Sequence, residues 1–290
     1  MGDAQSRMEN FKNQIKDGPD LRVNTTIVMF TGLSSSDTLT QHYKKRKMEG
    51  GLVATGLIKS LLEIVGNMTP APALAGLGTM AISIIIDSFY PSLPEESTKD
   101  ALRSVFAEEK ASEVWDQIDE CLKRCVMHIK NDHELVTDIR RIEVQLSTAL
   151  TKLKNSMVKD GHMSSQALKA WVNGAAFHVQ MLIHLVRLGG TQTCDPVERL
   201  LSTYLRDLDT LFKEHREMIE AKCRNLRAPS RLVDEESNVY HIAHASHVEY
   251  FDVYYDQRYM SQKYNIERYF CDVKQNLQML VDQRGYLKVY

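Results

Sequence analysis

The chain has 290 residues, and its 36 Lys and Arg nearly balance its 38 Asp and Glu, which leaves a formal net charge of −2. This balance argues against a general nucleic-acid binder, which shows a basic face, and against an acidic disordered chain. Hydrophobic residues make up 43% of the chain, with only 14 Gly and 7 Pro, which is typical of a helix-rich globular protein.

The N-terminal segment, residues 1–48, is predicted to be an arm that is partly disordered or irregular. Residues 1–20 are polar and charged and lack the apolar centre of a secretory signal, so we expect no signal peptide. Residues 21–36 are rich in β-branched side chains and end in a serine run, which indicates a short strand or an irregular arm. The chain has five cysteines, an odd count that does not fit a disulfide framework. A reducing, cytoplasmic location is therefore expected.

The most unusual stretch is a Gly- and Ala-rich run without charged residues that lies between Glu63 and Asp87. A Pro-Ala-Pro motif interrupts this run, and proline both lacks an amide donor and clashes with the preceding helical turn. The sequence therefore predicts two helices, over residues 51–67 and 73–89. The second helix is hydrophobic on nearly every side, which is typical of a helix inside a bundle or inside a membrane.

Two interpretations of this second helix stay open. We favour a buried core helix, because the uncharged run after the prolines is short for a membrane span. The alternative is a helical hairpin over residues 51–89 that inserts into a membrane. Its candidate membrane-insertion residues are Leu74, Leu77, Met80, Ile82, Ile84, Ile85 and Ile86.

The chain beyond residue 96 follows the spacing of amphipathic helices. Apolar residues recur every three or four positions over 97–157, which predicts one long helix or a kinked pair, with a break or a re-cap at Asn131 and Asp132. Further helices follow up to residue 223. Residues 49–227 are therefore predicted to form one all-α helical bundle around a central hydrophobic helix. Residues 228–290 are predicted to be a connector with little regular structure, followed by an aromatic-rich C-terminal helix that packs on the bundle.

No catalytic motif is present: the sequence has no GxSxG elbow, no P-loop and no dinucleotide-binding GxGxxG after a strand. We therefore predict no catalytic residue, no cofactor and no enzyme activity. His241 and His244 are weak metal candidates, because on a helix their spacing would place both on one face, but we favour a surface histidine run. Cys121 and Cys125 lie one helical turn apart, and we interpret them as reduced core residues rather than a metal or redox pair.

The C-terminal region is rich in aromatic residues. Tyr254, Tyr255 and Tyr259 are candidate interface residues, because tyrosine is enriched where proteins bind one another. The alternative, which we favour, is that these tyrosines pack onto the bundle.

The order of these segments resembles a known family. The segment GLVATGLIKSLLEIVGNMTPAPALAGLGTMAISIIIDSF (51–89), the motif VWDQI (114–118) and the segment YFDVYYDQRYMSQKYNIERYFCDVKQNLQMLV (250–281) are similar to the rapunzel family of fish proteins and to related cephalotoxin-like proteins. The resemblance covers roughly residues 45–283. It implies a helical bundle like the N-terminal helical domain of δ-endotoxins and other α-pore-forming toxins, with no enzyme activity and with a developmental role in fin and skeletal growth.

Two functions are consistent with these observations. The leading hypothesis is a non-enzymatic, intracellular helical bundle that acts through protein partners in a developmental or immune-regulatory role. The alternative is a membrane-active, pore-forming-like protein that inserts residues 51–89 and contacts membrane lipid. Neither hypothesis involves nucleic acid.

Overall fold

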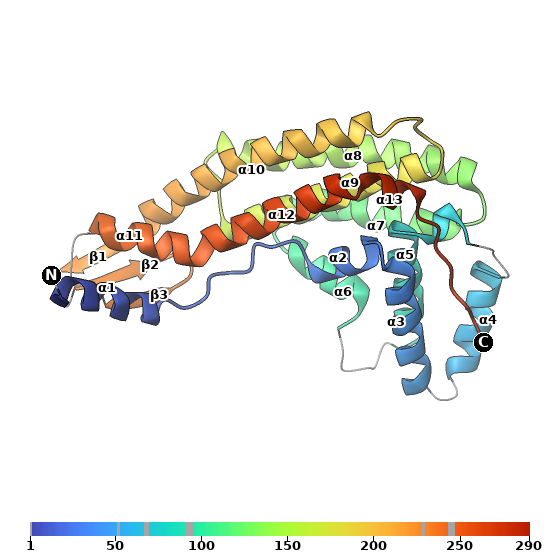
Figure 1. Ribbon diagram of the computed structural model, residues 1–290, viewed down its shortest axis with the longest axis horizontal. Coiled ribbons are helices and arrows are strands. Elements are labelled where there is room, and N and C mark those ends of the chain that lie inside the picture. The colour runs from blue at the N-terminus through green and yellow to red at the C-terminus, as the bar shows by residue number, and fades with distance from the viewer. Residues whose placement is uncertain (1, 51–52, 67–69, 91–95, 228–229, 243–246) are drawn as a thin grey trace.

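The computed structural model describes residues 2–50, 53–66, 70–90, 96–227, 230–242 and 247–290. Helices make up 77% of the chain, so the predicted all-α helical bundle is confirmed. The molecule is elongated: its longest helices run along the long axis, and a lobe of shorter helices projects from one end (Figure 1).

The long helices are α7 (Ser112–Met127), α8 (Asp132–Val158), α9 (Ser165–Arg187) and α10 (Asp195–Lys222). Asn131 and Ser164 accept hydrogen bonds from the amides of Glu134 and Ala167, and these N-caps set where α8 and α9 begin. Of the two alternatives, the stretch is divided, since α7 ends at Met127 and Asn131 caps a separate helix. Nearly every residue of α9 is buried, because α7, α8 and α10 all pack against it.

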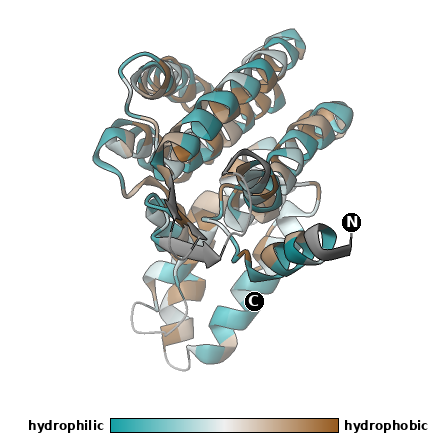
Figure 2. Cartoon of the chain, turned by 90° about the vertical axis from the view of Figure 1, so that its left-hand side faces the viewer, coloured by the Kyte–Doolittle hydropathy of each residue, from teal (hydrophilic) through white to brown (hydrophobic). Residues whose placement is uncertain are grey.

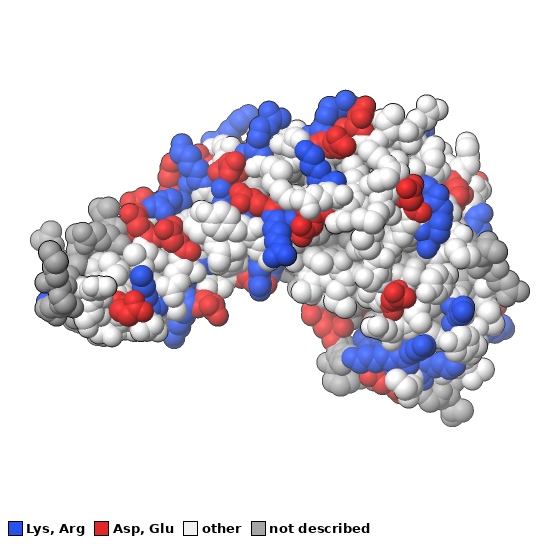
Figure 3. Space-filling model, viewed as in Figure 1, with Lys and Arg blue, Asp and Glu red and all other residues white. Residues whose placement is uncertain are grey.

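The outer helices carry polar and apolar residues on different sides, as Figure 2 shows in a view along the long axis. On the face shown in Figure 3, basic and acidic side chains alternate along the long helices, and basic side chains gather over α3 (Ser35–Glu49). The small net charge therefore reflects many charges of both signs rather than a shortage of charges.

The projecting lobe contains the hydrophobic pair predicted from the sequence, as α4 (Val53–Ile64) and α5 (Leu77–Ser88). A 3₁₀ turn, η1 (Pro72–Leu74), lies between them, where the prolines interrupt the run. Helix α5 packs against α2 (Thr25–Thr31), α3, α6 (Thr98–Arg103) and α7. The interpretation of residues 73–89 as a buried core helix is therefore confirmed. Two more 3₁₀ turns, η2 (Ser104–Phe106) and η3 (Glu109–Ala111), connect α6 to α7.

The N-terminal segment differs from the prediction of an irregular arm. It forms α1 (Gly2–Gln14), α2 and α3, and its residues Phe11, Leu21, Ile27, Leu39 and Tyr43 are buried in the core. Helix α2 forms in spite of its β-branched residues because Asn24 caps it and because α3, α5 and α9 cover it. Few apolar residues occur in α3, so its helical periodicity is too sparse to detect in the sequence.

A small antiparallel sheet replaces the irregular connector expected after residue 228. Its strands are β1 (Cys223–Arg227), β2 (Ser230–Asp234) and β3 (Val239–Ile242), in the order β1-β2-β3. Cys223 pairs with Asp234, and Asp234 also pairs with Val239. The left-handed backbone of Asn238, with φ of 52°, allows the turn between β2 and β3.

The C-terminal region returns along the bundle as α11 (His247–Tyr255), a π-helix, η4 (Asp256–Met260), α12 (Ser261–Gln275) and α13 (Leu277–Asp282). Ile266 and Phe270 of α12 are buried, and α12 packs against α10, so the predicted packing of this region on the bundle is confirmed. Gly285 then forms an antiparallel bridge with Ala71, with N–O distances of 2.9 and 3.0 Å.

Candidate functional site

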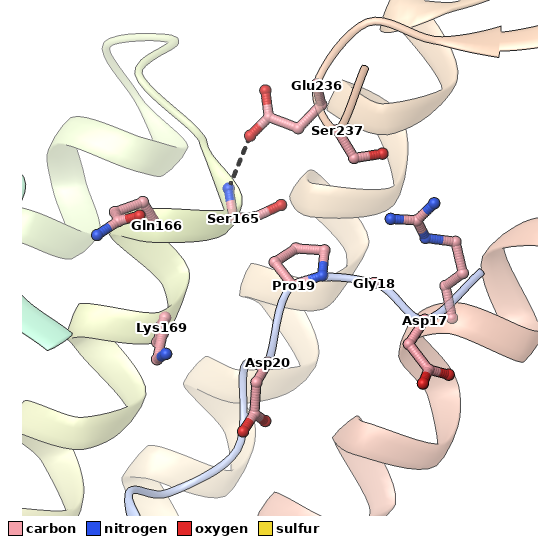
Figure 4. A pocket seen from close by; sticks show the side chains of 10 residues that line it. Asp17, Gly18, Pro19, Asp20, Ser165, Gln166, Lys169, Glu236 and Ser237 are labelled. Carbon is pink, nitrogen blue, oxygen red and sulfur yellow. Dashed lines mark hydrogen bonds between the residues drawn. The ribbon is translucent and has the colours of Figure 1, made fainter. Parts of the chain in front are cut away.

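A polar cavity of about 460 Å³ lies where four distant segments of the chain meet. Its wall consists of residues 17–20 between α1 and α2, here named the strap, the first turn of α9, the β2–β3 turn and the π-helix. Figure 4 shows these side chains around the N-terminal end of α9. The lining residues are Asp17, Gly18, Pro19, Asp20, Ser165, Gln166, Lys169, Glu236, Ser237 and Arg258.

A chain of hydrogen bonds leads from the cavity wall into the core. The Ser165 hydroxyl lies 3.0 Å from Nε2 of His215, and Nδ1 of His215 lies 3.0 Å from the Tyr255 hydroxyl. Tyr255 donates its only hydroxyl proton to the Phe212 carbonyl, at 3.1 Å. It must therefore accept a proton from Nδ1, which leaves Nε2 of a neutral imidazole to accept from Ser165.

His215 is neutral at physiological pH because it is fully buried. Burial lowers its pKa to about 4, although the nearby carboxylates of Glu236 and Asp234 act in the opposite direction. A serine that donates to a neutral histidine is also the arrangement of an activated nucleophile. Here, however, the residue that orients the histidine is a tyrosine rather than a carboxylate.

Glu236 occupies the positive end of α9. Its Oε1 accepts a hydrogen bond from the Ser165 amide at 3.1 Å, drawn as a dashed line in Figure 4, and its other oxygen pairs with Lys222. An acid is stabilised there by the free amides and the dipole of the helix. The carboxylates of Asp17 and Asp20 point away from Glu236, and Asp20 pairs with Arg22 at 2.8 Å.

A second buried network shapes the β2–β3 turn. Asp234, which is fully buried, accepts from the Glu236 amide at 2.9 Å, from the Ser237 hydroxyl at 2.6 Å and from the Tyr254 hydroxyl at 2.6 Å. Arg258 Nη1 in turn donates to the Tyr254 oxygen at 2.5 Å. The charges of Arg258 and Asp234 are therefore linked through a tyrosine rather than by direct contact.

The π-helix explains why consecutive residues of this segment face inward. Arg258 and Tyr259 are both buried, and the Arg258 guanidinium lies 4.9 Å from the Tyr254 ring centre and 5.6 Å from that of Tyr259. A π-turn is less favourable than an α-turn, and such turns occur frequently at functional sites. This segment is therefore the local feature that most clearly marks the cavity as a site.

The three candidate interface tyrosines all lie in the core beside this cavity. Tyr254, Tyr255 and Tyr259 are buried, and burial is the main reason why the pKa of each is raised. The three tyrosines therefore pack onto the bundle, which is the alternative favoured from the sequence. Their rings are not available to a partner protein in this conformation.

The candidate membrane-insertion residues lie in or next to α5. Leu74, Leu77, Met80, Ile82 and Ile86 are buried, whereas Ile84 and Ile85 are partly buried and pack against the core. Gly78 permits close packing there, because a Cβ at this position would lie 1.7 Å from the Ala73 carbonyl oxygen. Within the part of the chain that the structure describes, no helix is long and apolar enough to cross a membrane.

The remaining candidates do not form a metal site among the described residues. His241 lies on strand β3, paired with Leu232, and not on a helix, whereas His244 lies outside the described residues. No group of three possible metal ligands occurs in the described ranges. Cys121 and Cys125 are buried, as expected of core residues.

The residues that line the cavity were not predicted from the sequence. His215, which lies behind the wall, shows a signal, since it takes a position on the apolar stripe of α10 between Leu211 and Ile219. Ser165, Glu236 and Arg258 come from separate segments that show no common spacing.

The fold and this site define a helical-bundle protein with a polar cavity at one end. No family model, no curated protein and no solved structure matches the sequence significantly. The resemblance to the rapunzel family therefore stays a prediction.

Proposed function

We propose that this chain is a non-enzymatic binding protein whose polar cavity receives a small polar ligand. The observation that carries the proposal is Arg258, a buried cation at the cavity wall whose Nε has no hydrogen-bond acceptor among the described residues. A cavity of 460 Å³ with a few converging polar groups falls within the usual size of small-molecule sites.

Binding is favoured over catalysis by the state of the Ser165–His215 pair. A general base works best with a pKa near the working pH, and the pKa of His215, lowered to about 4, lies far below it. The Ser165 amide, which lies at the helix end that would stabilise an oxyanion, already donates to Glu236. The pair therefore supports a structural role at the base of the cavity.

The cavity also offers a route to protein partners. The strap connects α1, which packs on α11 and β3, with α2 on the far side of the cavity. A ligand that contacts both the strap and the β2–β3 turn would fix the position of α1 relative to the sheet. In this proposal, a partner protein binds the surface that α1 and the sheet form in the ligand-bound state.

The test is a thermal-shift screen of small polar compounds with the full chain, followed by hydrogen exchange on each compound that binds. We expect protection at residues 17–20 and 232–237. The variant Lys169→Trp, which narrows the cavity, should abolish the shift, whereas Lys213→Trp on the exposed face of α10 should not. Binding that persists unchanged in Lys169→Trp would contradict the proposal.

A second candidate function, membrane activity, is favoured by one observation. The most apolar helix, α5, is covered on several sides by other helices, and Asp87 near its end bonds to α3 and α6. With 12 residues, α5 is about 18 Å long, against a hydrocarbon core of about 30 Å. Membrane activity would therefore require α4 and α5 together. A liposome-leakage assay with Ile84→Asp or Ile85→Asp as controls tests it, and absence of leakage at every pH and lipid composition would rule it out.

A further inference from the structure

We propose that the ligand of the cavity carries an oxyanion, a carboxylate or a phosphate, which Arg258 binds. This inference rests on the proposed binding function and specifies the chemical group that the cavity recognises. Lys169 is a second cation in the cavity lining, and the N-terminal end of α9, on which it lies, adds positive potential.

Arg258 is the residue that carries the inference. It is only 3% exposed, and of its guanidinium nitrogens only Nη1 has an acceptor among the described residues, the Tyr254 oxygen. Its Nε is buried without a hydrogen-bond partner in those ranges, and the same is true of the buried Tyr259 hydroxyl. Buried donors without acceptors are costly, so a site of this kind gains free energy when a ligand supplies the acceptors.

The strap is positioned to respond to such a ligand. Gly18 lies directly against Arg258, since a Cβ at this position would lie 3.1 Å from Nε and 3.2 Å from Tyr259 Cε1. Because Gly18 has no side chain, the strap backbone packs directly over the guanidinium, and Nε is buried beneath it in this conformation. An oxyanion that binds Arg258 therefore contacts the strap as well.

The acidic residues of the lining determine which ligand charge the cavity favours. Glu236 is neutralised by Lys222 and by the Ser165 amide, and the carboxylates of Asp17 and Asp20 point to the other side of the strap. An oxyanion in the cavity is therefore paired with the two cations of the lining, Arg258 and Lys169. The charge of Glu236 opposes a bound oxyanion, because this residue also lines the cavity.

The experiment measures the binding of inorganic phosphate and of acetate to the full chain by calorimetry and thermal shift, at constant ionic strength kept with sodium chloride. The two probes distinguish a phosphate from a carboxylate ligand. Arg258→Gln should weaken binding about tenfold or more, because a hydrogen bond to a charged group is lost. Glu236→Gln should strengthen binding, and Arg206→Gln, which alters an exposed arginine of α10, should leave it unchanged.

Weaker binding by Arg258→Gln together with tighter binding by Glu236→Gln supports the inference. If Arg258 had only a structural role, Glu236→Gln would not bind the oxyanion more tightly. If Arg258→Gln does not fold, as judged by circular dichroism, Glu236→Gln and Lys169→Ala decide, and Lys169→Ala should weaken binding. Equal response to phosphate, acetate and chloride overturns the inference. Binding of a neutral or cationic compound that Lys169→Trp abolishes overturns it too, but leaves the proposed function in place.

Discussion

Asp87 joins three helices through a buried cluster of charges, and its neutralisation is the sharpest test of how the hydrophobic helix is held. Its Oδ1 lies 2.8 Å from His42 Nε2 and 3.0 Å from Arg46 Nε, both on α3. Its Oδ2 accepts from the amide and the hydroxyl of Thr98 on α6, at 2.8 and 2.7 Å. Both Asp87 and Arg46 are buried.

Asp87→Asn keeps the size of this side chain and removes its charge. Removal of one partner of a buried ion pair costs about 3–5 kcal/mol. Arg46 also has Glu49 at 3.5 Å, so we expect a loss at the lower end, about 3 kcal/mol in the free energy of unfolding. Urea denaturation followed by circular dichroism measures this loss, and Asp160→Asn, at an exposed position after α8, is the matched control.

Acid should act on the same cluster. Burial alone would raise the pKa of Asp87, but hydrogen bonds from His42 and Thr98 lower it below its ordinary value. A carboxyl whose folded-state pKa is depressed contributes stability above its unfolded pKa of about 3.9, and this stability is lost as pH falls through the folded value. Asp87→Asn should therefore reduce the pH dependence of stability below about pH 4. A loss under about 1 kcal/mol with an unchanged acid response would refute the reasoning.

Three further predictions concern other parts of the molecule. Gly285→Ala should destabilise the fold by about 2 kcal/mol or more, measured by urea denaturation, because its Cβ would lie 1.8 Å from the Leu74 carbonyl oxygen; an unchanged midpoint would contradict the bridge to Ala71. His215 should stay neutral down to about pH 4, so its ring resonances in NMR should not titrate near pH 6.5. Because the unfolded histidine binds its proton first, stability should fall between about pH 6.5 and pH 4. Cys271 is exposed whereas Cys121 is buried, so a thiol reagent should modify Cys271 first in the native protein, and the opposite order would contradict the packing of α7.

The long helices could be predicted because their residues repeat a pattern that the fold uses directly. The apolar stripe through Leu135, Ile139 and Ile142 is the buried face of α8, and Asn131 marks its start by a local hydrogen bond. Both signals lie within a few residues of the structure that they specify. Gly189 is a third local signal: its φ of 75° is the left-handed conformation that glycine adopts where a helix ends, here just after α9.

The N-terminal helices and the sheet could not be predicted in this way, because distant residues stabilise them. The Asn24 amide donates to Asn173 on α9, and the Asn24 side chain donates to the Ala101 carbonyl. Asp234 stabilises the β2–β3 turn, but its Tyr254 partner lies 20 positions away. The candidate site combines such long-range contacts from four segments, and no local spacing in a single sequence records them.

The contacts of the N-terminal segment have a consequence for the order in which the chain folds. The Leu21 amide donates to Gln262, 241 positions later, and the Gly32 carbonyl accepts from Gln283, 251 positions later. At about 5–20 residues per second, a ribosome takes roughly 10–50 s to make the intervening chain. During that time the Leu21 amide lacks its Gln262 partner, whereas α2 can already pack against α3 and α5. Helix α1, which packs on α11 and β3, and the strap, which bonds to Gln262, are therefore among the last segments to reach their native positions.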